Sequence, residues 1–118
     1  MRSYKKYKNQ KIIIDGIKFD SKAEGRRYKE LKLLEELGLI KSLKLQPKFE
    51  LQEKFVCNGK TERAINYIGD FEYFDVKKER LIVEDVKGVE TDVFKLKRKW
   101  FLYKYYQKYD LVVLKVWK

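Results

Sequence analysis

The sequence predicts a single α/β domain in which a mixed β-sheet is flanked by two helices. Its 118 residues are the length of one domain with one hydrophobic core. Two segments, residues 21–37 and 91–108, carry the end signals or the apolar spacing of helices. The segments before, between and after them are rich in β-branched and aromatic residues, which is typical of strands.

A β-hairpin is expected directly after a basic arm, residues 1–11, which is rich in lysine and tyrosine. Residues 12–14 and 17–19 flank Asp15-Gly16, a pair that favours a type I′ turn. We therefore expect the folded domain to span residues 12–118, with the hairpin at its start.

The first helix, residues 21–37, has clear signals at both ends. Ser21 and Glu24 have the spacing of a capping box at its start. Gly38 follows the last helical residue, where glycine commonly ends a helix.

Extended segments follow the first helix, with β-branched and apolar residues at residues 39–45, 49–55, 63–73 and 81–86. Pro47 ends the first of these segments, and a turn over residues 57–61 follows the second. Gly69 interrupts the third just before Asp70, and glycine in a strand often marks a bend or a close backbone approach. Residues 111–117 form a nearly continuous apolar run, which is expected of a strand inside a sheet.

The second helix, residues 91–108, carries an apolar stripe at helical spacing, formed by Val93, Leu96, Trp100 and Tyr103. We expect this stripe to pack against the core. Three basic residues lie mainly away from the stripe: Lys95, Arg98 and Lys99.

The charge of the chain points to nucleic acid. It has 29 Lys and Arg residues against 18 Asp and Glu, a net charge of +11 and an isoelectric point near 9.6. This balance is typical of domains that bind nucleic acid. Solubility alone, or attraction to anionic membranes, would be the simpler explanations.

The absence of histidine restricts the chemistry that the chain can perform. Without histidine there is no Ser-His-Asp or Cys-His catalysis and no Cys/His zinc site. The single cysteine, Cys57, cannot form an intrachain disulfide, which suggests a reducing compartment. No signal peptide or membrane-spanning run is visible, so we expect a cytoplasmic protein of a bacterium, an archaeon or a virus within one, with no membrane partner and no organic cofactor.

Residues 81–88 contain the most informative pattern of the chain. Asp85 and Lys87 follow an apolar run and are two residues apart, so their side chains leave the same face of one strand. Since apolar surroundings disfavour charges, a chemical role is the simplest reason for this pair. Asp70 lies fifteen residues earlier, where neighbouring strands could bring both acids together. Glu84 points to the opposite face and is expected to be solvated or paired with a lysine.

Phosphodiester cleavage is the chemistry that this pattern favours, because Mg²⁺ prefers oxygen ligands and can activate water. Helical phase directs Glu24 toward the same core, and the backbone carbonyl of Val86 is a further candidate ligand. Each of these residues could instead have a purely structural role. Glu24 would then only close the capping box, and Asp70 would only form a turn. Asp85 and Lys87 would form a surface ion pair on an edge strand.

These residues resemble the PD-(D/E)XK nuclease superfamily, with Glu24 in the first helix, then Asp70, then Asp85-Val86-Lys87 before the second helix. The likeness is to a small phage-encoded endonuclease family similar to Holliday-junction resolvases, and it covers nearly the whole chain after the arm. Four segments carry it: residues 15–22, 45–49, 67–71 and 83–88. One difference is that Gly69 stands where the superfamily motif has proline.

The resemblance implies a restriction-endonuclease-like αβββαβ core and an endonuclease site that uses Mg²⁺ or Mn²⁺. It implies that Asp70 and Asp85 are metal ligands, that Lys87 is the catalytic lysine, and that Glu24 is the acid supplied by the helix. Gln46 lies in a shared segment and is expected either to line the site or to be an ordinary polar residue at a strand end.

Basic residues on both helices are candidates for binding DNA phosphates: Arg26, Arg27, Lys95, Lys97, Arg98 and Lys99. Each could equally belong to a solvated helix face. A domain this small has little room for sequence readout, so we expect it to recognise DNA shape, such as branched or junction DNA in phage recombination or repair. Two symmetric incisions favour a homodimer, with the tyrosine-rich end of the second helix and the last strand as expected contact surfaces.

Two other function classes fit the same sequence. The first is a non-catalytic, basic nucleic-acid-binding module that assists phage DNA replication or recombination. The second is an interaction protein whose basic arm docks a polymerase or recombinase. Metal-dependent cleavage of DNA would separate the nuclease from both.

Overall fold

The computed structural model of the protein describes residues 10–116, so most of the predicted basic arm lies outside the described residues. The helices are α1 (Lys22–Glu36) and α2 (Asp92–Tyr105). The strands are β1 (Ile12–Ile14), β2 (Ile17–Phe19), β3 (Ile40–Leu45), β4 (Lys48–Gln52), β5 (Phe55–Cys57), β6 (Lys60–Glu62), β7 (Ile65–Ile68), β8 (Phe71–Asp75), β9 (Arg80–Lys87) and β10 (Tyr109–Lys115).

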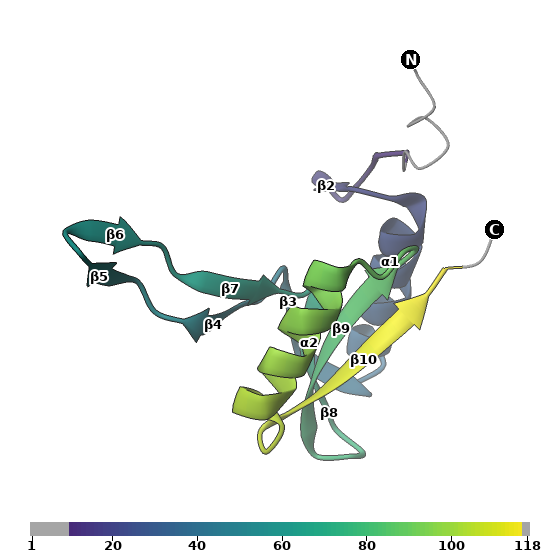
Figure 1. Ribbon diagram of the computed structural model, residues 1–118. Coiled ribbons are helices and arrows are strands. Elements are labelled where there is room, and N and C mark those ends of the chain that lie inside the picture. Colours follow the sequence, from purple (N-terminus) through teal and green to yellow (C-terminus); the bar gives the residue numbers. More distant parts are fainter. Residues whose placement is uncertain (1–9, 117–118) are drawn as a thin grey trace.

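A four-stranded mixed sheet forms the centre of the domain, with strand order β10-β9-β8-β3 (Figure 1). β10 runs parallel to β9, while β8 is antiparallel to both β9 and β3. Along the chain, the elements of this layer follow the order α1, β3, β8, β9, α2, β10. The prediction of a mixed sheet with two helices in one α/β domain is therefore confirmed.

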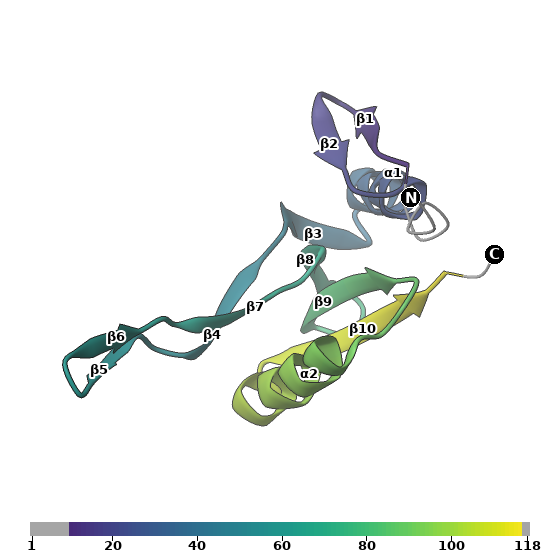
Figure 2. The same ribbon diagram turned by 45° about the horizontal axis from the view of Figure 1, so that its top comes forward.

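Each helix covers one face of the sheet. Successive side chains of β9 point to opposite faces, so neighbouring residues of this strand contact different helices. On one face, Tyr28 and Leu31 of α1 belong to a buried cluster that includes Ile82. On the other face, Phe94 and Phe101 of α2 pack in a second cluster around Val83. Figure 2 shows the two helices on opposite sides of β9 and β10. The side chain of Asp85 shares the α2 face with that of Val83.

The remaining strands leave the central sheet as hairpins. β1 and β2 pair next to α1, and their turn has positive φ at both Asp15 (54°) and Gly16 (76°), as a type I′ turn requires. β4 pairs with β7 and β5 with β6, and together they form a long arm that projects from the body of the domain (Figure 1). β7 ends at Ile68, so the base of this arm leads directly into Gly69 and Asp70.

The predicted role of the apolar stripe on the second helix is wrong for three of its four members; the fourth, Trp100, is half-buried and packs against the second cluster. The stripe residues Val93, Leu96 and Tyr103 are 63%, 61% and 81% exposed, whereas the buried residues of α2 are Phe94 and Phe101. The helix turns its two phenylalanine rings inward because they pack edge-on and tilted against the aromatic side chains of the second cluster. An apolar strip is thereby left on the surface.

The last strand was expected inside the sheet, but β10 lies at its edge, and among residues 10–116 it pairs only with β9. Its side chains are mostly half-buried, because both helices extend over this part of the sheet. The apolar composition of β10 is thus explained by the helices that cover both of its faces, although the strand is not central in the sheet. Neither helix within residues 10–116 has the length and apolarity of a membrane span.

Candidate active site

Asp85 lies at the buried centre of the candidate site. Its carboxylate is 1% exposed and accepts a hydrogen bond from the Tyr67 hydroxyl at 2.5 Å. The ammonium of Lys87 lies 3.2 Å from its other oxygen and 4.4 Å from the centre of the Phe94 ring. Because β9 has a neighbour on each side, the alternative of a surface ion pair on an edge strand does not apply.

Asp70 is held against the same strand by two backbone contacts. The Val86 N–H donates to the Asp70 carboxylate at 2.6 Å, and the Asp70 N–H donates to the Glu84 carbonyl at 2.9 Å. The pKa of Asp70 is raised to about 7, chiefly by burial and also by the charges of Glu24 and Asp85, while the hydrogen bond from Val86 opposes the shift. Asp70 therefore lies within the electrostatic reach of both other acids.

Glu24 reaches the site from the first turn of α1. Its N–H donates to the hydroxyl of Ser21 at 3.1 Å, which is one half of the predicted capping box. Burial raises the pKa of the Glu24 carboxyl, and so do the nearby charges of Asp20 and Asp85, while Lys87 lowers it. The backbone of Glu24 thus caps the helix, while its carboxyl lies near enough to Asp85 and Lys87 for their charges to act on its pKa.

The donor chemistry of the site suits a hard divalent cation. The charge of Asp85 contributes to the raised pKa of both Glu24 and Asp70, so a positive ion placed among these carboxylates would relieve repulsion. In a strand, the N–H and C=O of one residue point to the same side, so the Val86 carbonyl faces Asp70 as its N–H does. Within residues 10–116, however, no three acidic, cysteine or histidine side chains form a ready-made metal cluster. Metal binding would require these carboxylates to move together.

Gln46 also lies beside Asp70. Its N–H donates to the Asp70 carbonyl at 2.9 Å, and its φ of 50° is in the left-handed region that is uncommon for a residue other than glycine. The backbone of Gln46 therefore helps to fix the loop that carries Asp70. Its side chain is exposed.

Gly69 allows this loop to approach β9. A Cβ atom at Gly69 would lie 2.8 Å from the side chain of Val83, which is fully buried, and 3.4 Å from the Glu84 carbonyl. The proline of the superfamily motif would not fit either, because the Gly69 N–H donates to the Pro47 carbonyl at 3.0 Å. The difference from the motif therefore has a local structural reason.

Replacing Gly69 by alanine is expected to destabilise the protein by about 1–3 kcal/mol, because the added methyl group overlaps a buried side chain. Gly88→Ala is the matched control, since a Cβ there meets nothing within 4 Å. We expect that control to stay within about 0.5 kcal/mol of the wild type. Urea unfolding of both variants measures the difference, and equal stability of the two would contradict the close approach at Gly69.

Glu84 was expected to be solvated or paired with a lysine, and this prediction is wrong. Glu84 is 1% exposed and accepts two hydrogen bonds from the Arg27 guanidinium, at 2.7 and 2.6 Å, and one from the Tyr73 hydroxyl. The pKa of Arg27 is raised, chiefly by the hydrogen bond with Glu84. Arg27, expected to bind DNA, instead joins α1 to β9. This bond holds the helix that carries Glu24 against the strand that carries Asp85.

Breaking this buried pair is expected to be costly. Arg27→Met would leave the Glu84 carboxylate buried without its cation and should lower the free energy of unfolding by about 3–5 kcal/mol. Arg26→Met on the exposed side of the same helix should cost about 0.5 kcal/mol or less. Urea unfolding compares these variants with the double variant Arg27→Met/Glu84→Met. If the double variant does not recover stability relative to Arg27→Met, the loss has another origin.

The other predicted DNA-binding residues present free charges around the site. Within the part of the chain that the structure describes, none of them has a carboxylate at ion-pair distance: Arg26, Lys95, Lys97, Arg98 and Lys99. All except Lys97 are exposed. The charge of Arg98 helps to lower the pKa of Glu90 and opposes the larger rise in the pKa of Tyr67, so Arg98 lies near both. This cationic surface therefore adjoins the acidic site.

Two residues of the site had no predicted role. Tyr67 fixes the Asp85 carboxylate, and Phe94 contacts the ammonium of Lys87. Tyr67 precedes Asp70 by three residues, and a tyrosine in a buried strand needs a hydrogen-bond partner, which is the signal that could have indicated it. Burial and the bond with Asp85 both raise the pKa of the Tyr67 hydroxyl, so it stays protonated and donates.

Comparison with curated proteins gives no match, and comparison with solved structures gives none either. The sequence model of one protein family, described as "Protein of unknown function (DUF1064)", matches residues 4–118. That match covers the candidate site, both helices and the projecting arm. The chain therefore belongs to the DUF1064 family of proteins of unknown function.

Proposed function

We propose that the protein is a divalent-metal-dependent endonuclease that hydrolyses phosphodiester bonds in DNA. The observation that carries this proposal is the buried carboxylate of Asp85, 3.2 Å from the ammonium of Lys87 and close enough to Asp70 and Glu24 for its charge to raise the pKa of both. A buried acidic group without histidine, on a chain of net charge +11, is suited to a metal-assisted reaction on a polyanion.

The order α1, β3, β8, β9, α2, β10 supports the same proposal. It is the αβββαβ order of the restriction-endonuclease-like core that the resemblance to PD-(D/E)XK nucleases implies, with the arm of β4 to β7 inserted after the first strand. Asp70 directly precedes the second strand of this core, and Asp85 and Lys87 lie at the end of the third.

In this proposal Asp70, Asp85 and Glu24 would hold Mg²⁺ or Mn²⁺, and the Val86 carbonyl would be available as a further ligand. The bound ion would offset charge on the phosphate and make a nearby water more acidic. Tyr67 orients Asp85 by donating to one of its oxygens. Lys87 places a positive charge beside the acids, where it can contact the phosphate and stabilise charge that develops during cleavage.

The proposal is tested with supercoiled plasmid, linear duplex and a synthetic four-way junction, each incubated with Mg²⁺, Mn²⁺ or EDTA. We expect cleavage in either metal and none in EDTA, with the junction as the preferred substrate and a homodimer as the active species. A chain that binds these DNAs but cuts none of them in either metal would instead be the non-catalytic binding module.

A further inference from the structure

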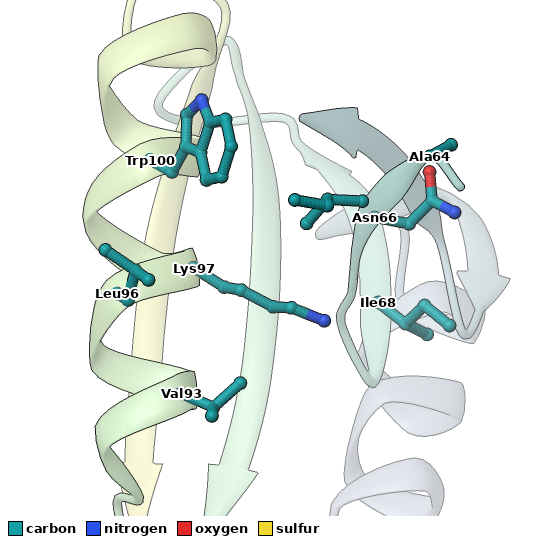
Figure 3. Close-up of a pocket in the computed structure, with 8 residues that line it drawn as sticks. Ala64, Asn66, Ile68, Val93, Leu96, Lys97 and Trp100 are labelled. Carbon is teal, nitrogen blue, oxygen red and sulfur yellow. The ribbon is translucent and has the colours of Figure 1, made fainter. Parts of the chain in front are cut away.

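An apolar groove of about 490 Å³ lies between the base of the projecting arm and α2. Its volume is within the range of small-ligand pockets, about 300–1,000 Å³. Most of its lining is apolar: Ile65, Ile68, Val93, Leu96 and Trp100. Figure 3 shows Val93, Lys97 and Trp100 projecting from α2 toward β7. The exposed apolar strip of α2 is therefore one wall of this groove.

The groove adjoins the candidate active site. Val93 directly precedes Phe94, whose ring contacts Lys87. Ile68, on the opposite wall, lies two residues before Asp70, a distance of about 6.7 Å along an extended chain. A molecule in the groove would thus lie beside a phosphate that is bound at the carboxylates.

The charge of the groove indicates what kind of molecule could bind there. Of the described residues that line it, Lys97 is the only charged one, and no carboxylate within residues 10–116 pairs with it. A second copy of this chain that covered the groove with an apolar face would bury Lys97 without a partner, which is unfavourable. A ligand with an apolar face and a negative charge satisfies both walls and the lysine.

We propose that this groove binds an unpaired nucleotide of the DNA substrate, with its base against the apolar walls and its phosphate near Lys97. This inference rests on the proposed function, since it specifies the substrate as DNA with unpaired bases next to the scissile phosphate. In intact duplex the base faces are stacked and only phosphates and groove edges are accessible. Unpaired bases expose faces that bind aromatic and apolar side chains, as in single-strand-binding proteins.

Tryptophan fluorescence tests this proposal without any cleavage. The sequence has two tryptophans, so Trp117→Phe leaves Trp100 as the only indole. In EDTA, an oligothymidylate should quench Trp100 emission, whereas a blunt duplex of equal length should leave it nearly unchanged. Equal quenching by the two DNAs, or no quenching by bound oligothymidylate, would overturn the proposal.

Matched variants on α2 separate the groove from general electrostatics. Val93→Glu puts a negative charge in the groove, and Tyr103→Glu puts the same charge on an exposed part of the same helix. By anisotropy in EDTA, Val93→Glu should weaken oligothymidylate binding about 10-fold or more relative to Tyr103→Glu. The two variants should bind duplex equally. An equal loss of oligothymidylate binding in both variants would overturn the proposal.

Sedimentation at the assay concentrations tests whether a second copy of the chain occupies the groove instead. If the wild type is a dimer and Val93→Glu is a monomer, the groove is an interface between copies and the proposal is wrong. Because all of these readouts are made without metal, they are independent of nuclease activity. A protein that cuts DNA but shows no preference for unpaired bases would refute the groove alone. A protein that shows the preference but never cuts would refute the nuclease alone.

Discussion

Replacing Asp85 by asparagine is expected to reduce DNA cleavage by about 10³-fold or more, the largest effect on activity that we predict. Asparagine keeps the shape of the side chain and can still accept the hydrogen bond from Tyr67, so the fold should persist. It removes the negative charge that a divalent cation requires and that pairs with Lys87. Single-turnover cleavage of the junction at saturating protein measures the effect.

Lys87 and Lys95 provide the comparison that separates chemistry from DNA binding. Lys87→Met should lower the cleavage rate about 10²–10⁴-fold while affinity for DNA stays nearly unchanged. Lys95→Met, at an exposed position of α2, should weaken binding and reduce the salt dependence of affinity without changing the rate at saturation. A cleavage rate that survives Asp85→Asn or Lys87→Met would show that the active site lies elsewhere.

Replacing Asp70 by asparagine is expected to stabilise the metal-free protein at pH 8, by up to about 4 kcal/mol. The pKa of Asp70 is about 7 in the folded protein, against an ordinary value of 3.8. The folded state therefore binds more protons than the unfolded state between these values, so this carboxyl makes the protein less stable as pH rises from about 4 to about 7. Asparagine carries no charge and should remove this loss.

The comparison is made by urea unfolding of wild type and Asp70→Asn at pH 5 and pH 8 in EDTA. The advantage of the variant should be larger at pH 8 than at pH 5. Mg²⁺ should then stabilise the wild type and not the variant, because a cation bound only to the folded state raises stability. An asparagine variant that is less stable than the wild type at pH 8 would contradict the electrostatic account of the site.

The local elements were predictable because their signals are local. The Asp15-Gly16 hairpin, the Ser21 cap of α1 and the apolar run of β9 each depend on neighbours in sequence, and all three are present in the structure. The pairing of Asp85 with Lys87 followed from the two-residue period of a strand, which needs no knowledge of the rest of the fold.

Contacts between distant segments were not predictable in this way. Arg27 and Glu84 are 57 residues apart, and nothing in either local sequence specifies that they meet. The inward face of α2 was also misassigned, because two phenylalanines and a four-residue stripe compete at the same helical period. Packing against the aromatic cluster decides between them, and that cluster draws on β4, β7 and the sheet.

The arm illustrates a further limit of sequence patterns. Its strands have ordinary β-propensity, yet β4 pairs with β7 and leaves the central sheet. Periodicity indicates that a segment is extended but does not indicate its partner. For this reason the sequence alone did not show the groove at the base of the arm.

The most direct test of the metal-dependent site is the position of Mn²⁺ in crystals of the protein, located by anomalous scattering. The proposed function predicts a peak between the carboxylates of Asp70 and Asp85, with Glu24 or the Val86 carbonyl as a further ligand. The same crystals of Asp70→Asn should lack this peak. Mn²⁺ bound only at other carboxylates, such as Glu90, or an identical peak in Asp70→Asn, would contradict the proposed site.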